Sequence, residues 1–322
     1  MHSDTTIRPL STRLFPKFKG ASAYALSGIA ARCDWIVLSD RSEPFVEDRL
    51  QTDVATVRTI FVSLRSHEAA LRHLFDTVVP RLTAPFVLVT GSEDVTLPNQ
   101  TDKRWPPLSE ELRNKLVQLL DNPLLIRWFC ENMDARIHSK QEALPLGLVF
   151  PDAEQDVELP VPDWGDIGQR YRRVLCAHRV RDGAQWETRK TVTELAKAHW
   201  RSFATILEEP VSEAAFEALI RSHAFVLCVE GGGLDPSPKA WQTLLHGAIP
   251  IVRRTPLTEA YDGFPIAIVD DWRGSALNAD KLEYWFEKHF RSGRLMAQRD
   301  QVIEKLGLDY WWRRIRSCLP GT

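Results

Sequence analysis

The chain has 322 residues, of which 44% are hydrophobic and 26% are charged, so it is long enough for about two globular domains. Its 41 basic and 43 acidic side chains give a formal net charge of −2, which argues against a nucleic acid as the main partner. No apolar run approaches the roughly 20 residues of a membrane span, and the first residues lack the charged and apolar blocks of a signal peptide. We therefore expect a cytoplasmic protein with no transmembrane segment.

Strand-like and helix-like segments alternate through the first half of the chain. Short apolar runs rich in β-formers predict strands, and apolar residues at helical spacing predict helices between them. The strands are expected at 33–38, 59–64, 85–90 and 124–130, and the helices at about 69–78 and 109–120. This alternation is typical of a parallel sheet covered by helices. We therefore expect a Rossmann-like domain over residues 1–155.

Residues 151–169 interrupt this pattern and predict a linker. They combine prolines and glycines with six acidic residues and show little apolar periodicity. A second alternation begins with a strand-like run at 173–178 and a helix at about 188–199. We expect a second Rossmann-like domain over residues 170–300. The predicted fold class is therefore α/β, with two parallel-sheet domains that face a central cleft.

The most specific motif follows a predicted buried strand at 225–229. Three glycines come next in the chain: Gly231, Gly232 and Gly233. Their lack of a side chain lets a ligand approach the backbone closely. Ser237 is placed to cap a short helix in which Pro238 is the first residue. The free N–H groups at the start of that helix, with the charge of Lys239, predict a site for an anion such as a pyrophosphate.

Several segments of this region resemble the donor-binding half of the exostosin-like glycosyltransferases of the GT-B fold. They are 225–228 (Phe-Val-Leu-Cys), 231–235 (Gly-Gly-Gly-Leu-Asp), 239–245 (Lys-Ala-Trp-Gln-Thr-Leu-Leu), 247–252 (Gly-Ala-Ile-Pro-Ile-Val) and 266–272 (Ile-Ala-Ile-Val-Asp-Asp-Trp). The chain departs from the family pattern at three points: the segment after Asp235 is one residue longer, Lys239 replaces a common arginine, and Gln242 replaces a common glutamate. The resemblance implies a GT-B-like arrangement, with an acceptor-side N-terminal domain and a nucleotide-sugar-binding C-terminal domain. It also implies a final helix over residues 301–322 that packs back on the N-terminal domain.

The resemblance further implies an enzyme that moves a sugar from a nucleotide-sugar donor to a hydroxyl group of a glycan or related acceptor, as in polysaccharide biosynthesis. The transfer is expected to invert the configuration of the sugar. The nucleotide sugar is then a substrate, and we expect no cofactor and no metal ion. The residues expected to bind the donor are Arg179, Arg181, Arg189, Gly231, Gly232, Gly233, Asp235, Lys239 and Gln242. Asp235 could instead brace the glycine loop by accepting hydrogen bonds from backbone N–H groups.

An inverting transfer also needs a base that accepts the proton of the acceptor hydroxyl. Asp94 is the leading candidate, because it follows the strand-like run at 85–90 at its carboxyl end. Glu93, Asp40 and His67 are rivals with a similar placement.

Two other functions stay open. A nucleotide-sugar epimerase would keep the phosphate-binding residues and lack an acceptor groove, and a non-catalytic binding module would lack a usable base. A dehydrogenase is disfavoured, because three consecutive glycines do not form the Gly-x-Gly-x-x-Gly pattern of dinucleotide sites.

Overall fold

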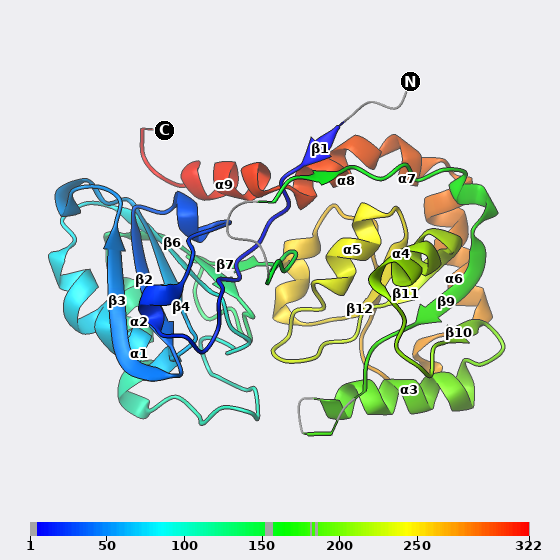
Figure 1. Ribbon diagram of the computed structural model, residues 1–322, viewed down its shortest axis with the longest axis horizontal. Helices are drawn as coiled ribbons and strands as arrows, with labels where there is room; N and C mark the ends of the chain where they lie inside the picture. Colours follow the sequence, from blue (N-terminus) through cyan, green and yellow to red (C-terminus); the bar gives the residue numbers. More distant parts are fainter. Residues whose placement is uncertain (1–4, 152–156, 181, 184–185, 322) are drawn as a thin grey trace. The chain divides into compact units, whose positions relative to one another are not determined.

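The structure is a computed structural model that describes residues 5–151, 157–180, 182–183 and 186–321. The chain forms two compact units, each with its own main sheet (Figure 1). We call the N-terminal unit the one built from Arg8–Glu158, Gly233–Asp235 and Gly307–Thr322. The C-terminal unit is built from Leu159–Gly232 and Pro236–Leu306, together with the start of the chain up to Ile7.

The N-terminal unit contains a six-stranded sheet in which all neighbouring strands but one pair run parallel. In spatial order its strands are β3 (Glu43–Leu50), β2 (Trp35–Asp40), β4 (Thr59–Ser63), β5 (Phe86–Gly91), β6 (Leu125–Glu131) and β7 (Gln141–Leu144). The strands β2, β4 and β5 are buried along their whole length, which explains their nearly continuous apolar sequences. The antiparallel pair joins β2 to the edge strand β3.

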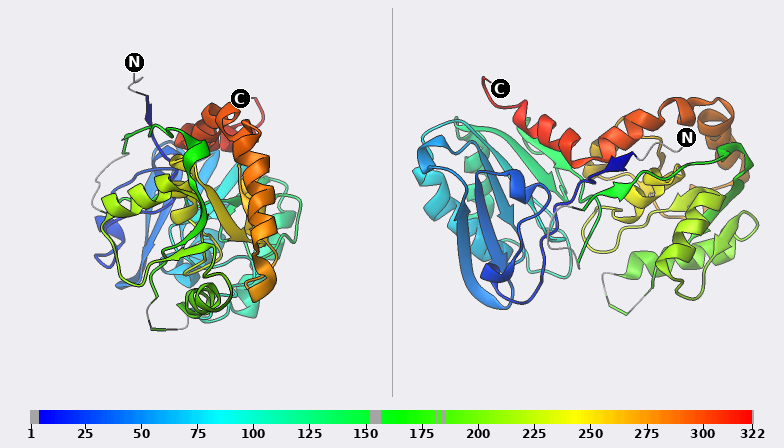
Figure 2. Two further views of the ribbon diagram at one scale, coloured as in Figure 1. Left: turned by 90° about the vertical axis from the view of Figure 1, so that its right-hand side faces the viewer. Right: turned by 45° about the horizontal axis from the view of Figure 1, so that its top comes forward.

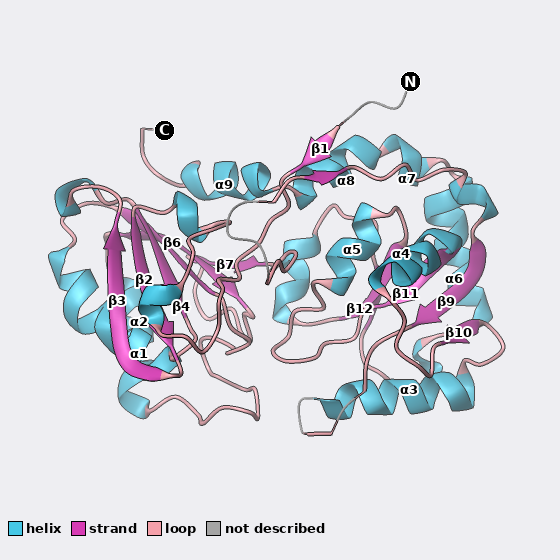
Figure 3. Cartoon of the chain, in the orientation of Figure 1, coloured by secondary structure: helices cyan, strands magenta, loops and turns pink. Residues whose placement is uncertain are grey.

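The helices of this unit are α1 (His67–His73), α2 (Glu110–Asp121) and α9 (Leu308–Arg316) (Figure 3). α1 packs against β2, β3 and β4, and α2 packs against β6. α2 begins after Ser109, whose hydroxyl oxygen accepts a hydrogen bond from the Leu112 N–H at 3.3 Å. Leu112, Leu116 and Leu119 are buried, so the helix presents one apolar face to the core.

The C-terminal unit contains a five-stranded, wholly parallel sheet. In spatial order its strands are β10 (Ala204–Ile206), β9 (Tyr171–Cys176), β11 (His223–Leu227), β12 (Ile249–Arg253) and β13 (Ala267–Val269). Its helices, coloured green to orange around the sheet in Figure 2, are α3 (Glu187–His199), α4 (Glu213–Ser222), α5 (Lys239–Leu245), α6 (Ala279–Phe286), α7 (Arg294–Ala297) and α8 (Arg299–Leu306). A separate antiparallel pair joins β1 (Thr6–Ile7) to β8 (Leu159–Pro160).

The order of these strands creates a topological switch point. The chain leaves β9 through α3 to reach β10 on one side, whereas it leaves β11 through α5 to reach β12 on the other side. β9 and β11 are direct neighbours, so their outgoing loops diverge at the carboxyl edge of the sheet. Open α/β sheets bind their ligands outside the strands at such a point.

The predicted α/β class with two parallel-sheet units is confirmed. β3 is not among the predicted strands, because its sequence, Glu-Pro-Phe-Val-Glu-Asp-Arg-Leu, carries the proline and charges that protect an edge strand. The predicted cap at Ser237 is wrong: Pro238 precedes the first turn of α5, and the Ser237 hydroxyl contacts the Tyr261 hydroxyl at 2.9 Å.

Among the described residues, none of the helices has the length and apolarity needed to span a membrane. The central cleft stays a prediction.

Candidate functional site

Arg189 lies against the root of the glycine loop in the C-terminal unit. A Cβ atom on Gly231 would come within 2.6 Å of the Nη2 atom of Arg189, so a larger residue there would displace the guanidinium. His178 follows β9 and donates a hydrogen bond from Nε2 to the Arg189 carbonyl at 3.0 Å, which fixes the first turn of α3 beside this loop. Burial, together with the charge of Lys239, lowers the pKa of His178 to about 3, so its ring is neutral.

Lys239 is a half-buried cation close to the same loop. It begins α5, and its Nζ atom lies 5.6 Å from the ring centroid of Phe216. Its ammonium makes no hydrogen bond or ion pair with the part of the chain that the structure describes. Burial, reinforced by the charge of Arg189, lowers the pKa of Lys239 to about 8. Arg189 and Lys239 are neighbouring cations, and Lys239 has no carboxylate partner among the described residues. This arrangement favours the binding of an anion.

The other predicted donor-binding residues of this unit are less constrained. Arg179 is exposed after β9, Gly232 is partly exposed, and Arg181 lies outside the described residues. Gln242 is half-buried on α5, and its side-chain amide makes no hydrogen bond with the residues described. Trp241 is a core residue, because it is fully buried and its indole donates to the Leu306 carbonyl at 3.1 Å. α5 spans only seven residues, so the anion site rests on side chains rather than on a helix terminus.

A cluster that the sequence does not predict holds the root of the glycine loop. Glu230 is buried directly before Gly231, and its carboxylate accepts hydrogen bonds from the Arg253 Nε and, at 2.9 Å, from the Trp272 indole. These residues follow or end β11, β12 and β13, which are neighbours in the sheet. Their shared position at strand ends is the only sequence signal for the cluster. The hydrogen bonds of Glu230 to Arg253 and Trp272 fix the backbone that leads into the glycines.

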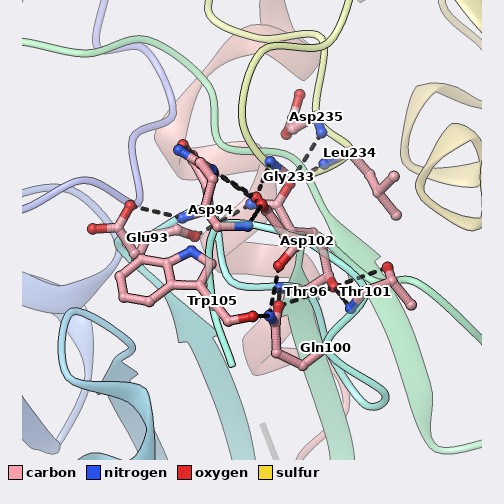
Figure 4. A network of polar contacts seen from close by, with 12 residues as sticks. Glu93, Asp94, Thr96, Gln100, Thr101, Asp102, Trp105, Gly233, Leu234 and Asp235 are labelled. Carbon is pink, nitrogen blue, oxygen red and sulfur yellow. Dashed lines mark hydrogen bonds and ion pairs between the residues drawn. The ribbon is translucent and has the colours of Figure 1, made fainter. Parts of the chain in front are cut away.

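The tip of the glycine loop belongs to the N-terminal unit, where its N–H groups already have partners (Figure 4). Gly233 donates to the Asp102 carboxylate at 2.9 Å, and Asp235 donates its N–H to the side-chain oxygen of Asn132 at 3.0 Å. The Asp235 carboxylate accepts a hydrogen bond from the Leu146 N–H at 2.6 Å. These bonds give Asp235 the bracing role that the sequence leaves open.

A buried network of charges lies at the carboxyl ends of β5 and β6. The guanidinium of Arg13 is buried and contacts three carboxylates, those of Asp94 at 2.5 Å, Glu131 at 2.8 Å and Glu93 at 3.7 Å. Burial raises the pKa of Glu131 to about 7, although the charge of Arg13 opposes the rise. Arg13 is therefore the central counter-ion of this network.

Asp94 has the most exposed carboxylate among the acidic members of the network. Its side chain is 25% exposed, against 8% for Glu93 and none for Glu131. Burial would raise the pKa of Asp94, but ion pairs with Arg13 and Arg104 outweigh it and hold the pKa well below its usual range. Asp94 is therefore ionised at neutral pH and partly exposed, but it is a weaker base than a free carboxylate.

The rival bases are more enclosed. Glu93 is paired with Arg65 at 2.9 Å. Asp40 is buried, and although burial alone would raise its pKa, hydrogen bonds from Tyr24 and its other donors lower it. His67 is buried, its ring centroid lies 5.2 Å from that of Trp105, and burial lowers its pKa.

No protein-family model matches the chain, and a search of curated proteins finds no match. Among solved structures, the chain is similar to spinosyn rhamnosyltransferase SpnG complexed with spinosyn aglycone, at a TM-score of 0.37 and 11% identity over 81% of this chain and 73% of that chain. The same transferase complexed with thymidine diphosphate has a TM-score of 0.34 and 12% identity over the same shares. Similarities this low carry no argument about function, so the assignment below rests on the residues of this chain.

Proposed function

We propose that the chain transfers a sugar from a nucleotide-sugar donor to a hydroxyl group of a glycan or related acceptor. The observation that carries this proposal is the pair of cations at the glycine loop. Arg189 lies against Gly231, and Lys239, whose pKa is lowered by burial and then by the charge of Arg189, has no carboxylate partner among the described residues. A diphosphate group would supply the missing negative charge. The resemblance of residues 225–272 to exostosin-like glycosyltransferases supports a nucleotide sugar as its source.

In the proposed reaction, the cations act on the leaving group. As the bond between the sugar and the diphosphate breaks, negative charge develops on the diphosphate oxygens. Arg189 and Lys239, with the exposed Arg179, would stabilise that charge by charge-assisted hydrogen bonds to the diphosphate oxygens. Gly231 and Gly232 would let the diphosphate approach the backbone, and Gln242 and Arg181 stay predicted donor contacts. Gly233 and Asp235 enter the proposal as braces of the loop.

We propose Asp94 as the base that accepts the proton of the acceptor hydroxyl in an inverting transfer. Its partly exposed and ionised carboxylate supports this role over Glu93, Asp40 and His67, whose side chains are more buried. The carbon of the sugar then forms a bond to the acceptor oxygen as the bond to the diphosphate breaks. No cofactor is required by this scheme, since the leaving diphosphate carries both electrons of the broken bond.

A thermal-shift panel of UDP, GDP, CMP, ADP and NAD tests the proposed donor. We expect one nucleoside diphosphate to raise the unfolding temperature, because a ligand at 100 times its Kd stabilises the folded state by about 2.7 kcal/mol. The monophosphate of the same base should stabilise less, since it offers fewer charged oxygens to Arg189 and Lys239. Stabilisation by NAD alone, or by none of the five, would contradict the proposal.

A further inference from the structure

A second pair of cations lies on the N-terminal unit, outside the residues proposed for the donor. Lys17 precedes Phe18, and Arg41 follows Asp40 at the end of β2. The Phe18 N–H donates to the Asp40 carboxylate at 3.0 Å, so this hydrogen bond joins the residue after Lys17 to the residue before Arg41. Asp40 also accepts from the Tyr24 hydroxyl and, at 2.8 Å, from the Ser42 N–H. This arrangement is therefore fixed by several bonds to one buried carboxylate.

Among the described residues, neither cation has a carboxylate within close hydrogen-bond distance. The Lys17 ammonium lies 5.4 Å from the ring centroid of Phe15 and makes no hydrogen bond or ion pair with the residues that the structure describes. Burial, together with the charge of Arg65, lowers the pKa of Lys17 to about 8. Arg41 reaches Glu93 only at 3.6 Å, whereas Arg65 is closer to the same carboxylate at 2.9 Å. Arg41 therefore shares the Glu93 carboxylate with Arg65, and Lys17 forms no ion pair with the described residues.

An exposed aromatic residue, Phe18, directly follows Lys17 in the sequence. Phe18 is 58% exposed, and its backbone has φ of 61°, a left-handed conformation that a bulky side chain rarely adopts. Such strain costs of order 1–3 kcal/mol and is concentrated at ligand-binding positions. The guanidinium of Arg41 lies 3.5 Å from the ring centroid of Trp105, which orients it by a cation–π contact. The strained and exposed Phe18 thus follows Lys17 directly, and its N–H is bonded to Asp40, the residue before Arg41.

We propose that Lys17, Phe18 and Arg41 form a binding site for a small ligand that carries a carboxylate or phosphate group on a sugar-like ring. The anionic group pairs with Lys17 and Arg41, and the apolar face of the ring packs on Phe18. The ligand of this site is the acceptor of the proposed transfer, and this identification alone rests on the proposed function. Binding at the site does not depend on the donor.

The test uses three matched probes with the full chain: glucose 6-phosphate, glucuronate and neutral glucose. Binding is followed by ligand-observed NMR and calorimetry in a Lys239→Ala background, so that the glycine-loop site contributes little. We expect at least one anionic probe to bind and glucose to bind at least tenfold more weakly. Binding of the phosphate alone would assign a phosphorylated acceptor, and binding of the carboxylate alone would assign an acidic sugar.

The variants Lys17→Met and Arg41→Met should each weaken the anionic probe by about tenfold or more, because each removes a charge-assisted contact. Lys19→Met, at an exposed lysine two residues from Lys17, serves as the control and should change nothing. Phe18→Gly should weaken binding severalfold without lowering the unfolding temperature, because glycine relieves the strained backbone.

Binding of neither anionic probe, equal binding of glucose, or unchanged binding in both Lys17→Met and Arg41→Met would overturn the site. If the nucleotide panel fails while the anionic probes bind through Lys17, the site stands and its assignment to an acceptor is wrong. The failure of this inference and that of the proposed function are therefore distinguishable.

Discussion

Replacing Arg13 with methionine should lower the free energy of unfolding by about 3–5 kcal/mol, as expected when one partner of a buried ion pair is removed. The methionine keeps most of the volume but leaves Asp94, Glu131 and Glu93 without their shared cation. Glu131 is the most enclosed of the three, with a fully buried side chain. The measurement is urea denaturation followed by circular dichroism.

A matched control and a rescue sharpen this prediction. Arg72 forms exposed ion pairs with Glu111 and Glu68 at 2.9 and 3.2 Å, so Arg72→Met should lower the free energy of unfolding far less than Arg13→Met. Adding Glu131→Gln to Arg13→Met should recover part of the lost stability, since glutamine is neutral without the proton that a buried Glu131 must take up when Arg13 is absent. A change below 1 kcal/mol in Arg13→Met would show that the network tolerates the loss of its central cation.

Asp94→Asn should lower the turnover of the transferase by about 10²–10⁴-fold, the usual contribution of a general base. The low end of that range is expected, because the two arginines make Asp94 a weaker base. Donor affinity should stay nearly unchanged, since Asp94 has no proposed contact with the diphosphate. The assay uses the nucleotide sugar whose diphosphate stabilises the chain most, with turnover and donor affinity measured separately.

Glu93→Gln is the control, because Glu93 is adjacent in the chain but only 8% exposed. Both variants must first be shown to be folded by their unfolding temperatures, since each disturbs a buried ion pair. Wild-type turnover in Asp94→Asn together with its loss in Glu93→Gln would move the base to Glu93. A product that retains the configuration of the donor sugar would reject the inverting mechanism.

The sheets are predictable from the sequence where their strands are buried on both faces. Phe86–Gly91 and His223–Leu227 lie inside parallel sheets, so their apolar runs carry a strong local signal. The edge strand Glu43–Leu50 lacks that signal, because an edge needs charges and proline rather than continuous apolarity. The start of α5 differs for a local reason: the Ser237 hydroxyl contacts Tyr261 instead of capping the helix.

The candidate site is predictable only in part, because much of it depends on contacts between distant residues. Gly231 and Lys239 stand in a recognisable local motif, and Arg189 is found by its place after the first strand of the second half. Arg13 is surrounded by an ordinary sequence, and its partner Asp94 lies 81 residues away along the chain. No spacing rule connects two such residues before the fold brings them together. A local motif can also include residues that do not belong to the site: Trp241 stands in the motif but is buried in the core.

The most direct test of the proposed donor site is a calorimetric titration of the stabilising nucleoside diphosphate into the wild-type and Lys239→Ala proteins. Loss of a charge-assisted contact should weaken binding by about one to two decades in the variant. The pKa of Lys239 is about 8, so the lysine is mostly charged at pH 7 and mostly neutral at pH 9. The nucleotide affinity of the wild type should therefore fall from pH 7 to pH 9. The affinity of Lys239→Ala should not fall over that range. Lys197→Ala, at an exposed lysine paired with Glu208 at 3.3 Å, should bind like the wild type. Equal affinities in folded wild-type and Lys239→Ala proteins at both pH values would contradict the assignment of the glycine loop as the donor site.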